Sequence, residues 1–204
     1  MGQARQRKLE SQKFEALDRT WLLSLSSEER QIVEVASRVH QKVVMEGGMW
    51  GGCYHLSFFL KRYLKKQRNI EVEVVVGWVG EDSWQGVASH AWVEFGGRKI
   101  DVALSRTEDS RTLPTGSFIL LDRVLLQGMA DYRYYREVPE HAKDALIRLA
   151  LAPETAATSR LAHQRHRQML AMVDDEPAID RYLASLTGGM GYRQLALLAG
   201  LPLD

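Results

Sequence analysis

The stretch SHAWVEFGGRKIDVAL, residues 89–104, decides the fold because it predicts two strands joined by a tight turn. The two adjacent glycines in its middle tolerate the positive φ angles that a two-residue hairpin turn requires. With these glycines as the turn, Glu94 faces Lys99, and Val93 faces Ile100. One pair is complementary in charge and the other is apolar, so both support the same strand register.

This register brings a histidine and a carboxylate to one face of the hairpin. Side chains alternate along a strand, so His90 and Trp92 point to the same side. Asp101 lies opposite Trp92 and is therefore the diagonal neighbour of His90. Diagonal Cβ atoms lie about 7 Å apart, within reach of an imidazole–carboxylate hydrogen bond. The hairpin alone predicts a His–Asp pair.

The chain has one cysteine, Cys53, which follows two glycines at the start of a predicted helix ending near Gln67. Unpaired N–H groups at a helix start favour negative charge, depress the pKa of a thiol and can hold an oxyanion. A lone free cysteine is commonly a small core residue. The predicted pairing of His90 with Asp101 shifts the interpretation of Cys53 to a catalytic nucleophile.

The remaining segments predict an α+β fold. A capping box at Ser26 and Glu29 opens a helix with an apolar face, which ends at the glycines of residues 47–52. Further predicted elements are one or two helical segments in residues 3–25, strands near residues 70–78, 116–128 and 131–138, and four helices after Pro139. We expect residues 1–138 to form the core with its N-terminal helices, and residues 139–204 to form a helical region packed on it.

Composition excludes several classes of protein. The 204 residues carry a net charge of +1, which is too small to indicate nucleic-acid binding, and no apolar run is long enough to span a membrane. A single cysteine permits no internal disulfide and suggests a reducing, cytoplasmic location. We expect no metal site and no cofactor. His163 and His166 lie in a cationic stretch, for which a solvated basic face is the favoured interpretation.

Residues 51–64, 73–79 and 89–104 together resemble the core of the transglutaminase-like superfamily, which has a papain-like fold with a Cys-His-Asp triad. The similarity spans about residues 45–105, and the chain resembles a small stand-alone member of bacterial type. It implies Cys53 as nucleophile, His90 as general base and acid, and Asp101 as the residue that orients the imidazole. The chain departs from the family pattern in lacking the proline that often follows this aspartate.

The expected activity is acyl chemistry at an amide or ester carbonyl through an acyl-enzyme, as in a cysteine protease, deamidase or transglutaminase. A protein or peptide is the expected substrate, bound in a cleft lined by Trp50, Gly52, Trp84 and Trp92. An arylamine N-acetyltransferase-like acyl transfer uses the same triad, but this chain lacks the Arg-Gly-Gly and Asp-Val-Gly motifs of that family. A non-catalytic protein-binding module on the same fold is the alternative from a different class. The sequence does not indicate the oligomeric state.

Overall fold

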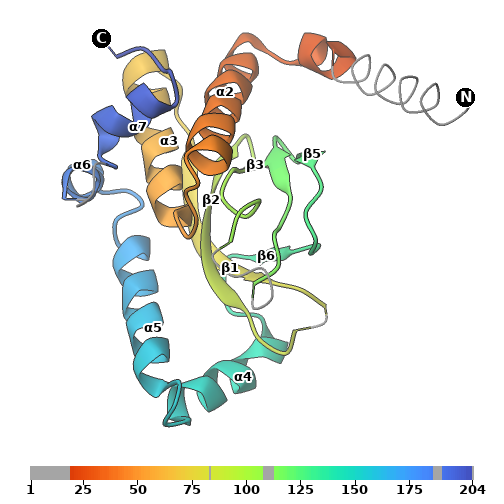
Figure 1. Ribbon diagram of the computed structural model, residues 1–204, viewed down its shortest axis with the longest axis vertical. Helices are drawn as coiled ribbons and strands as arrows, with labels where there is room; N and C mark the ends of the chain where they lie inside the picture. The colour runs from red at the N-terminus through yellow and green to blue at the C-terminus, as the bar shows by residue number, and fades with distance from the viewer. Residues whose placement is uncertain (1–18, 83, 108–112, 186–189, 204) are drawn as a thin grey trace, which may run out of the picture.

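The structure is a computed structural model that describes residues 19–82, 84–107, 113–185 and 190–203. This part of the chain has an α+β fold in which the helices lie mainly to one side of a curled six-stranded sheet (Figure 1). The elements before the sheet are α2 (Ser27–Arg38), the π-helix η1 (Val39–Glu46) and α3 (Cys53–Arg68). Of the helical segments predicted in residues 3–25, residues 19–24 are helical, and the part before residue 19 lies outside the described residues.

The sheet is antiparallel, with the strand order β5-β4-β3-β2-β1-β6. Its strands are β1 (Glu73–Gly80), β2 (Ala88–Phe95), β3 (Arg98–Asp101), β4 (Phe118–Leu120), β5 (Arg123–Leu126) and β6 (Arg133–Tyr135). The predicted hairpin register is confirmed, because Val93 pairs with Ile100 and Glu94 with Lys99. The long β1–β2 pairing places Gly77 opposite His90.

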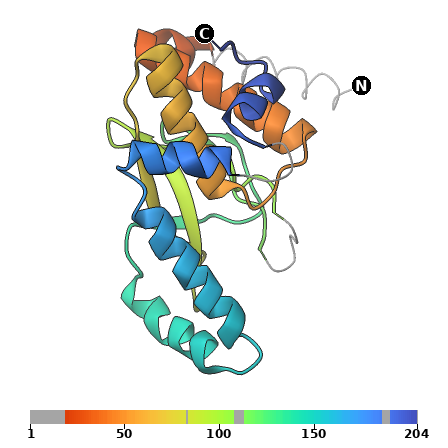
Figure 2. The ribbon, with the colours of Figure 1, turned by 90° about the vertical axis from the view of Figure 1, so that its left-hand side faces the viewer.

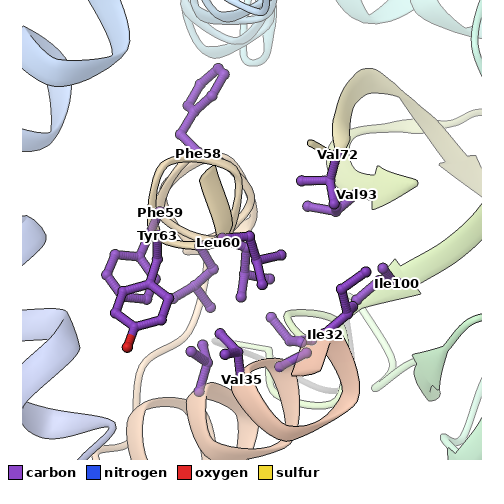
Figure 3. Packing of buried hydrophobic residues seen from close by; sticks show 14 of the residues in the cluster. Ile32, Val35, Phe58, Phe59, Leu60, Tyr63, Val72, Val93 and Ile100 are labelled. Atoms are coloured by element: carbon purple, nitrogen blue, oxygen red, sulfur yellow. The ribbon is translucent and has the colours of Figure 1, made fainter. Parts of the chain in front are cut away.

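Helix α3 forms the centre of the molecule and is buried on nearly every side. Phe58, Phe59 and Tyr63 are each 0% exposed. Figure 3 shows Phe59, Leu60 and Tyr63 directed toward α2 while Phe58 points to the other side of the helix. A helix that is buried on nearly every side needs packing partners on all of them, and here they are α2, the β1–β2 hairpin and the C-terminal helices. The first residue of this helix is Cys53, so the core fixes the position of the thiol.

The four predicted C-terminal helices are α4 (Glu140–Leu151), α5 (Ala156–Leu170), α6 (Glu176–Ala184) and α7 (Tyr192–Leu198). Helices α6 and α7 pack on α3, whereas α5 packs on β1 and β2 and against α4 (Figure 2). The buried Arg62 of α3 binds Glu176 at 2.5 Å and Asp180 at 2.7 Å, which ties α6 to the core. No helix among the described residues is long and apolar enough to cross a membrane.

Candidate active site

Cys53 is held at the N-terminus of α3 by a glycine-rich loop. Gly51 has a φ of +64°, a backbone conformation that favours glycine, and the N-cap residue Gly52 provides no capping side chain. The N–H of Leu56 bonds the Gly52 carbonyl at 2.8 Å, whereas the N–H groups of the preceding first turn have no acceptor within the helix. The partly buried thiol therefore lies beside free backbone donors.

His90 and Asp101 form the predicted pair. His90 Nε2 lies 2.6 Å from Asp101 Oδ2. The other carboxylate oxygen, Oδ1, accepts a hydrogen bond from the Ala103 N–H at 2.9 Å. The Tyr134 hydroxyl also donates to Oδ2, at 2.8 Å. Asp101 thus has a partner on each oxygen, which an ionised carboxylate needs in so buried a position.

The thiol of Cys53 completes the arrangement through a hydrogen bond with the His90 side chain. Since Nε2 of His90 is engaged by Asp101, Nδ1 is the ring nitrogen left for the sulfur. Burial by itself raises the pKa of the Cys53 thiol, but the hydrogen bond and the charge of His90 outweigh it and lower the pKa below its usual value.

The pKa of His90 is shifted in the opposite direction to that of Cys53. Burial by itself lowers the pKa of the imidazole, but the charge and hydrogen bond of Asp101, followed by those of Cys53, raise it to about 10. A thiol with a lowered pKa beside an imidazole with a raised pKa favours the thiolate–imidazolium form near neutral pH. The arrangement can therefore supply both a nucleophile and a proton donor.

Tyr134 is a site residue that sequence analysis missed. It lies on β6, opposite Val79 of β1. Its ring packs edge-on against Trp92, with centroids 5.2 Å apart, and Lys99 Nζ lies 3.8 Å from its centroid. Burial raises the pKa of its hydroxyl far above the usual value, so the group remains a hydrogen-bond donor to Asp101. The alternation of side chains in residues 131–138 predicts which face of the strand Tyr134 lies on, but no local signal places this strand beside β1.

Cys53 and His90 open onto a cleft of about 610 Å³. One side of the cleft is formed by residues 50–54 around the thiol, by Trp78 and Val79 of β1, and by residues 87–90 where β2 begins. The segment after β3 contributes Ala103, Leu104, Arg106, Thr107 and Leu113. Helices α4 and α5 and the turn between them contribute Leu146, Leu149, Thr155, Thr158, Ser159, Ala162, His163 and Arg165. Trp50 and Gly52 lie in it, as predicted. The C-terminal helices thus contribute to the same cleft as the thiol.

Trp84 and Trp92 differ from the prediction, because neither is among the described residues that line this cleft. Trp92 is 2% exposed, and its indole N–H donates to Glu94 Oε1 at 2.7 Å. It shares a face with His90 as predicted, but Tyr134 covers it. Trp84 packs edge-on against Tyr132, with centroids 5.5 Å apart, and faces a separate hollow. Trp92 therefore packs beside the His90 ring inside the protein and does not line the cleft.

His166 also differs from the prediction, because it is buried at the edge of the site and not on a solvated face. Its Nδ1 lies 2.5 Å from Ser89 Oγ, and Ser89 Oγ lies 2.5 Å from the Tyr54 hydroxyl. The ring stacks on Trp78 at 4.4 Å. Burial, and to a lesser extent the charge of His163, lowers the pKa of His166 and favours its neutral form. Tyr54 follows the cysteine and Ser89 precedes the catalytic histidine candidate, so α5 is hydrogen-bonded to Ser89 directly and to Tyr54 through the Ser89 hydroxyl.

Within the described ranges, no group of three or more His, Cys, Asp or Glu side chains is placed to hold a metal ion. Comparison of the chain with protein-family models, with curated proteins and with solved structures finds no match. The geometry around Cys53 is therefore the basis on which a function can be assigned.

Proposed function

We propose that this protein is a cysteine hydrolase or acyltransferase of transglutaminase-like type, with a papain-like arrangement of nucleophile helix and sheet. The observation that carries the proposal is the chain of contacts from Cys53 to His90 to Asp101 at the edge of an open cleft. Nucleophilic catalysis by cysteine needs a thiolate, a base to exchange its proton and a group that orients the base. These three side chains supply those functions in that order.

In the acylation step, the Cys53 thiolate attacks the carbonyl carbon of an amide or ester, and the carbonyl electron pair moves to the oxygen. The free N–H groups at the start of α3 stabilise this oxyanion. The tetrahedral intermediate then collapses, the bond to the leaving group breaks, and protonated His90 gives its Nδ1 proton to the departing amine or alcohol. The product is a thioester on Cys53.

In the second step, His90 takes a proton from water or from an acceptor amine as its oxygen or nitrogen bonds to the thioester carbon. The carbon–sulfur bond breaks, and the thiolate–imidazolium pair returns. Water gives hydrolysis and an amine gives acyl transfer, and the triad serves both. We propose a protein or peptide as the substrate, in keeping with a cleft that is open to solvent.

Acylation of Cys53 by p-nitrophenyl acetate, followed by intact mass, tests the proposal. The wild type should gain one acetyl group with a burst of nitrophenolate, and Cys53→Ser should abolish the burst. His90→Gln should slow acylation by about 100-fold or more, because it removes the proton acceptor and donor. If the wild type reacts no faster than a free small thiol, or if Cys53→Ser is acylated equally, the proposal is wrong and a binding module is the better interpretation.

A further inference from the structure

The cleft next to Cys53 is large and is lined in part by apolar side chains. Its volume of about 610 Å³ lies within the range of about 300–1,000 Å³ that is usual for small-molecule sites. Six valine and leucine side chains line it, and we call them the apolar wall: Val79, Val87, Leu104, Leu113, Leu146 and Leu149. They come from β1, from the residue just before β2, from the segment after β3 and from helix α4, so four parts of the chain contribute to this surface.

The apolar wall is partly open to solvent. Leu149 is 45% exposed although it lines the cleft. Water in contact with such side chains is released when an apolar group replaces it, and this release favours binding. Val79 and Leu104 are buried, so the part of the wall that a ligand can contact is formed by the partly buried Val87, Leu113 and Leu146 and by the exposed Leu149.

Charge in the cleft restricts the ligand further. The described lining residues include Arg106 and Arg165, and no carboxylate is among them. Arg165 lies over the Tyr54 ring, 5.8 Å from its centroid, next to the nucleophile. Two guanidinium groups repel a cationic side chain, whereas an apolar group experiences no such penalty. A lysine-like or arginine-like group is thus disfavoured beside Cys53.

The wall is also fixed in position relative to the thiol. Helices α4 and α5 pack together, and α5 is anchored by the His166–Ser89 hydrogen bond and by the stack of His166 on Trp78. Because Ser89 also binds the Tyr54 hydroxyl, the same contacts hold both the wall and the residue that follows Cys53. A bound group would be held in a defined orientation to the sulfur.

We propose that the apolar wall is a specificity subsite for an uncharged aliphatic or aromatic acyl group, placed so that its carbonyl carbon reaches Cys53. This inference rests on the proposed function, since the acyl group is the part of the substrate that Cys53 receives. The substrate class is thus a peptide or other acyl donor with an apolar residue on the acyl side of the scissile bond.

A pair of esters that share one leaving group tests this subsite. The second-order rate of Cys53 acylation should be higher for p-nitrophenyl hexanoate than for p-nitrophenyl acetate, by about two- to four-fold for each added methylene group. Leu149→Glu places a charge on the wall and should lower the hexanoyl-to-acetyl ratio by about ten-fold or more. Leu151→Glu is the matched control, because Leu151 lies on the same helix, is 76% exposed and is not among the lining residues. Its ratio should equal that of the wild type.

Binding to an inactive variant gives a second readout that is independent of turnover. Cys53→Ala should bind hexanamide more tightly than acetamide in calorimetry, and the additional Leu149→Glu change should remove the difference. Equal acylation of wild-type Cys53 by both esters, or equal binding of both amides, overturns the subsite and leaves the proposed function intact. If neither ester acylates Cys53 but hexanamide still binds preferentially, the proposed function is overturned while the apolar subsite stands as a binding site.

Discussion

His90 Nε2 lies 2.6 Å from Asp101 Oδ2, and the two residues are only 2% and 1% exposed. An isolated carboxylate in such a position is strongly unfavourable, because water cannot solvate its charge. Asp101 is paired with His90, the Ala103 N–H and the Tyr134 hydroxyl, so its charge is retained inside the protein. This retained charge determines the protonation of the histidine and, through it, that of the thiol.

We expect Asp101→Asn to lower the pKa of His90. Burial opposes the charged imidazole, and it is mainly the charge of Asp101 that raises the pKa to about 10. An asparagine keeps the shape and loses the charge, so the His90 pKa should fall by about 1 to 3 pH units. Titration of the His90 ring signals by NMR measures this directly. An unchanged His90 pKa in the variant would show that Asp101 does not set the protonation of the site.

Tyr134→Phe should reduce stability in a pH-dependent way. Loss of a hydrogen bond to a charged group costs about 1.5 to 3 kcal/mol of unfolding free energy. Burial acts to raise the pKa of Asp101, but its partners, Tyr134 among them, hold it below 3.8. Stability from a lowered carboxyl pKa is present above the unfolded value and is lost as the pH falls through the folded one. The difference from wild type should therefore be full at neutral pH and shrink below about 3.8.

Urea unfolding at several pH values measures this difference. Tyr135→Phe is the matched control, because Tyr135 points to the opposite face of β6 and packs against His141, with centroids 5.9 Å apart. A Tyr134→Phe protein that matches this control at every pH would exclude the hydrogen bond as a source of stability.

Ser89→Ala should slow turnover without unfolding the protein. The substitution removes the hydroxyl that joins Tyr54 to His166, so both the residue after Cys53 and helix α5 lose a partner. Small displacements of reacting groups cost up to about 100-fold in rate, and we expect kcat to fall by about 10- to 100-fold. Ser89→Thr keeps the hydroxyl and should retain most of the activity.

Steady-state kinetics with an ester substrate measures the effect on kcat. The control is Ser117→Ala, which removes another buried serine hydroxyl, one that accepts a hydrogen bond from the Gly128 N–H at 3.1 Å. Equal kcat values for Ser89→Ala and Ser117→Ala would exclude a positioning role for Ser89.

Gly77→Ala should destabilise the sheet beside the site. A Cβ at Gly77 would lie 2.8 Å from Trp92 Cη2 and would also collide with the Tyr135 carbonyl oxygen. Both neighbours are tightly packed, so the unfolding free energy should fall by about 1 to 3 kcal/mol. Gly86→Ala is the control, because a Cβ there meets its nearest atom, the Ala145 Cβ, at an ordinary 3.7 Å. Thermal unfolding in which the two variants behave alike would contradict this packing.

The local parts of the site were predictable from the sequence. The Gly-Gly turn and the alternation of residues 90–101 are short-range signals, and they gave the strand register and the His–Asp pair correctly. The start of helix α3 at Cys53 was also signalled locally, by two glycines followed by an apolar helical pattern.

The long-range parts of the site were not predictable. Tyr134 reaches Asp101 because β6 pairs with β1 across a separation of more than fifty residues, and no sequence pattern selects that pairing. The same strand covers Trp92 and removes it from the cleft. Likewise, the sequence around His166 is that of a solvated basic helix, and it is the packing of α5 on Trp78 that buries this residue. Each of these contacts depends on tertiary packing, which single-sequence patterns do not encode.

The most direct test of the central claim is the rate of Cys53 alkylation by iodoacetamide as a function of pH, in wild type and in His90→Gln. With one cysteine in the chain, every mass increase from a modified thiol is assigned to Cys53. We predict rapid alkylation that persists well below the free-thiol pKa of about 8.5, and a return to the ordinary thiol profile in the variant. Slow alkylation with the same ordinary profile in both proteins would contradict the account and identify Cys53 as a structural residue.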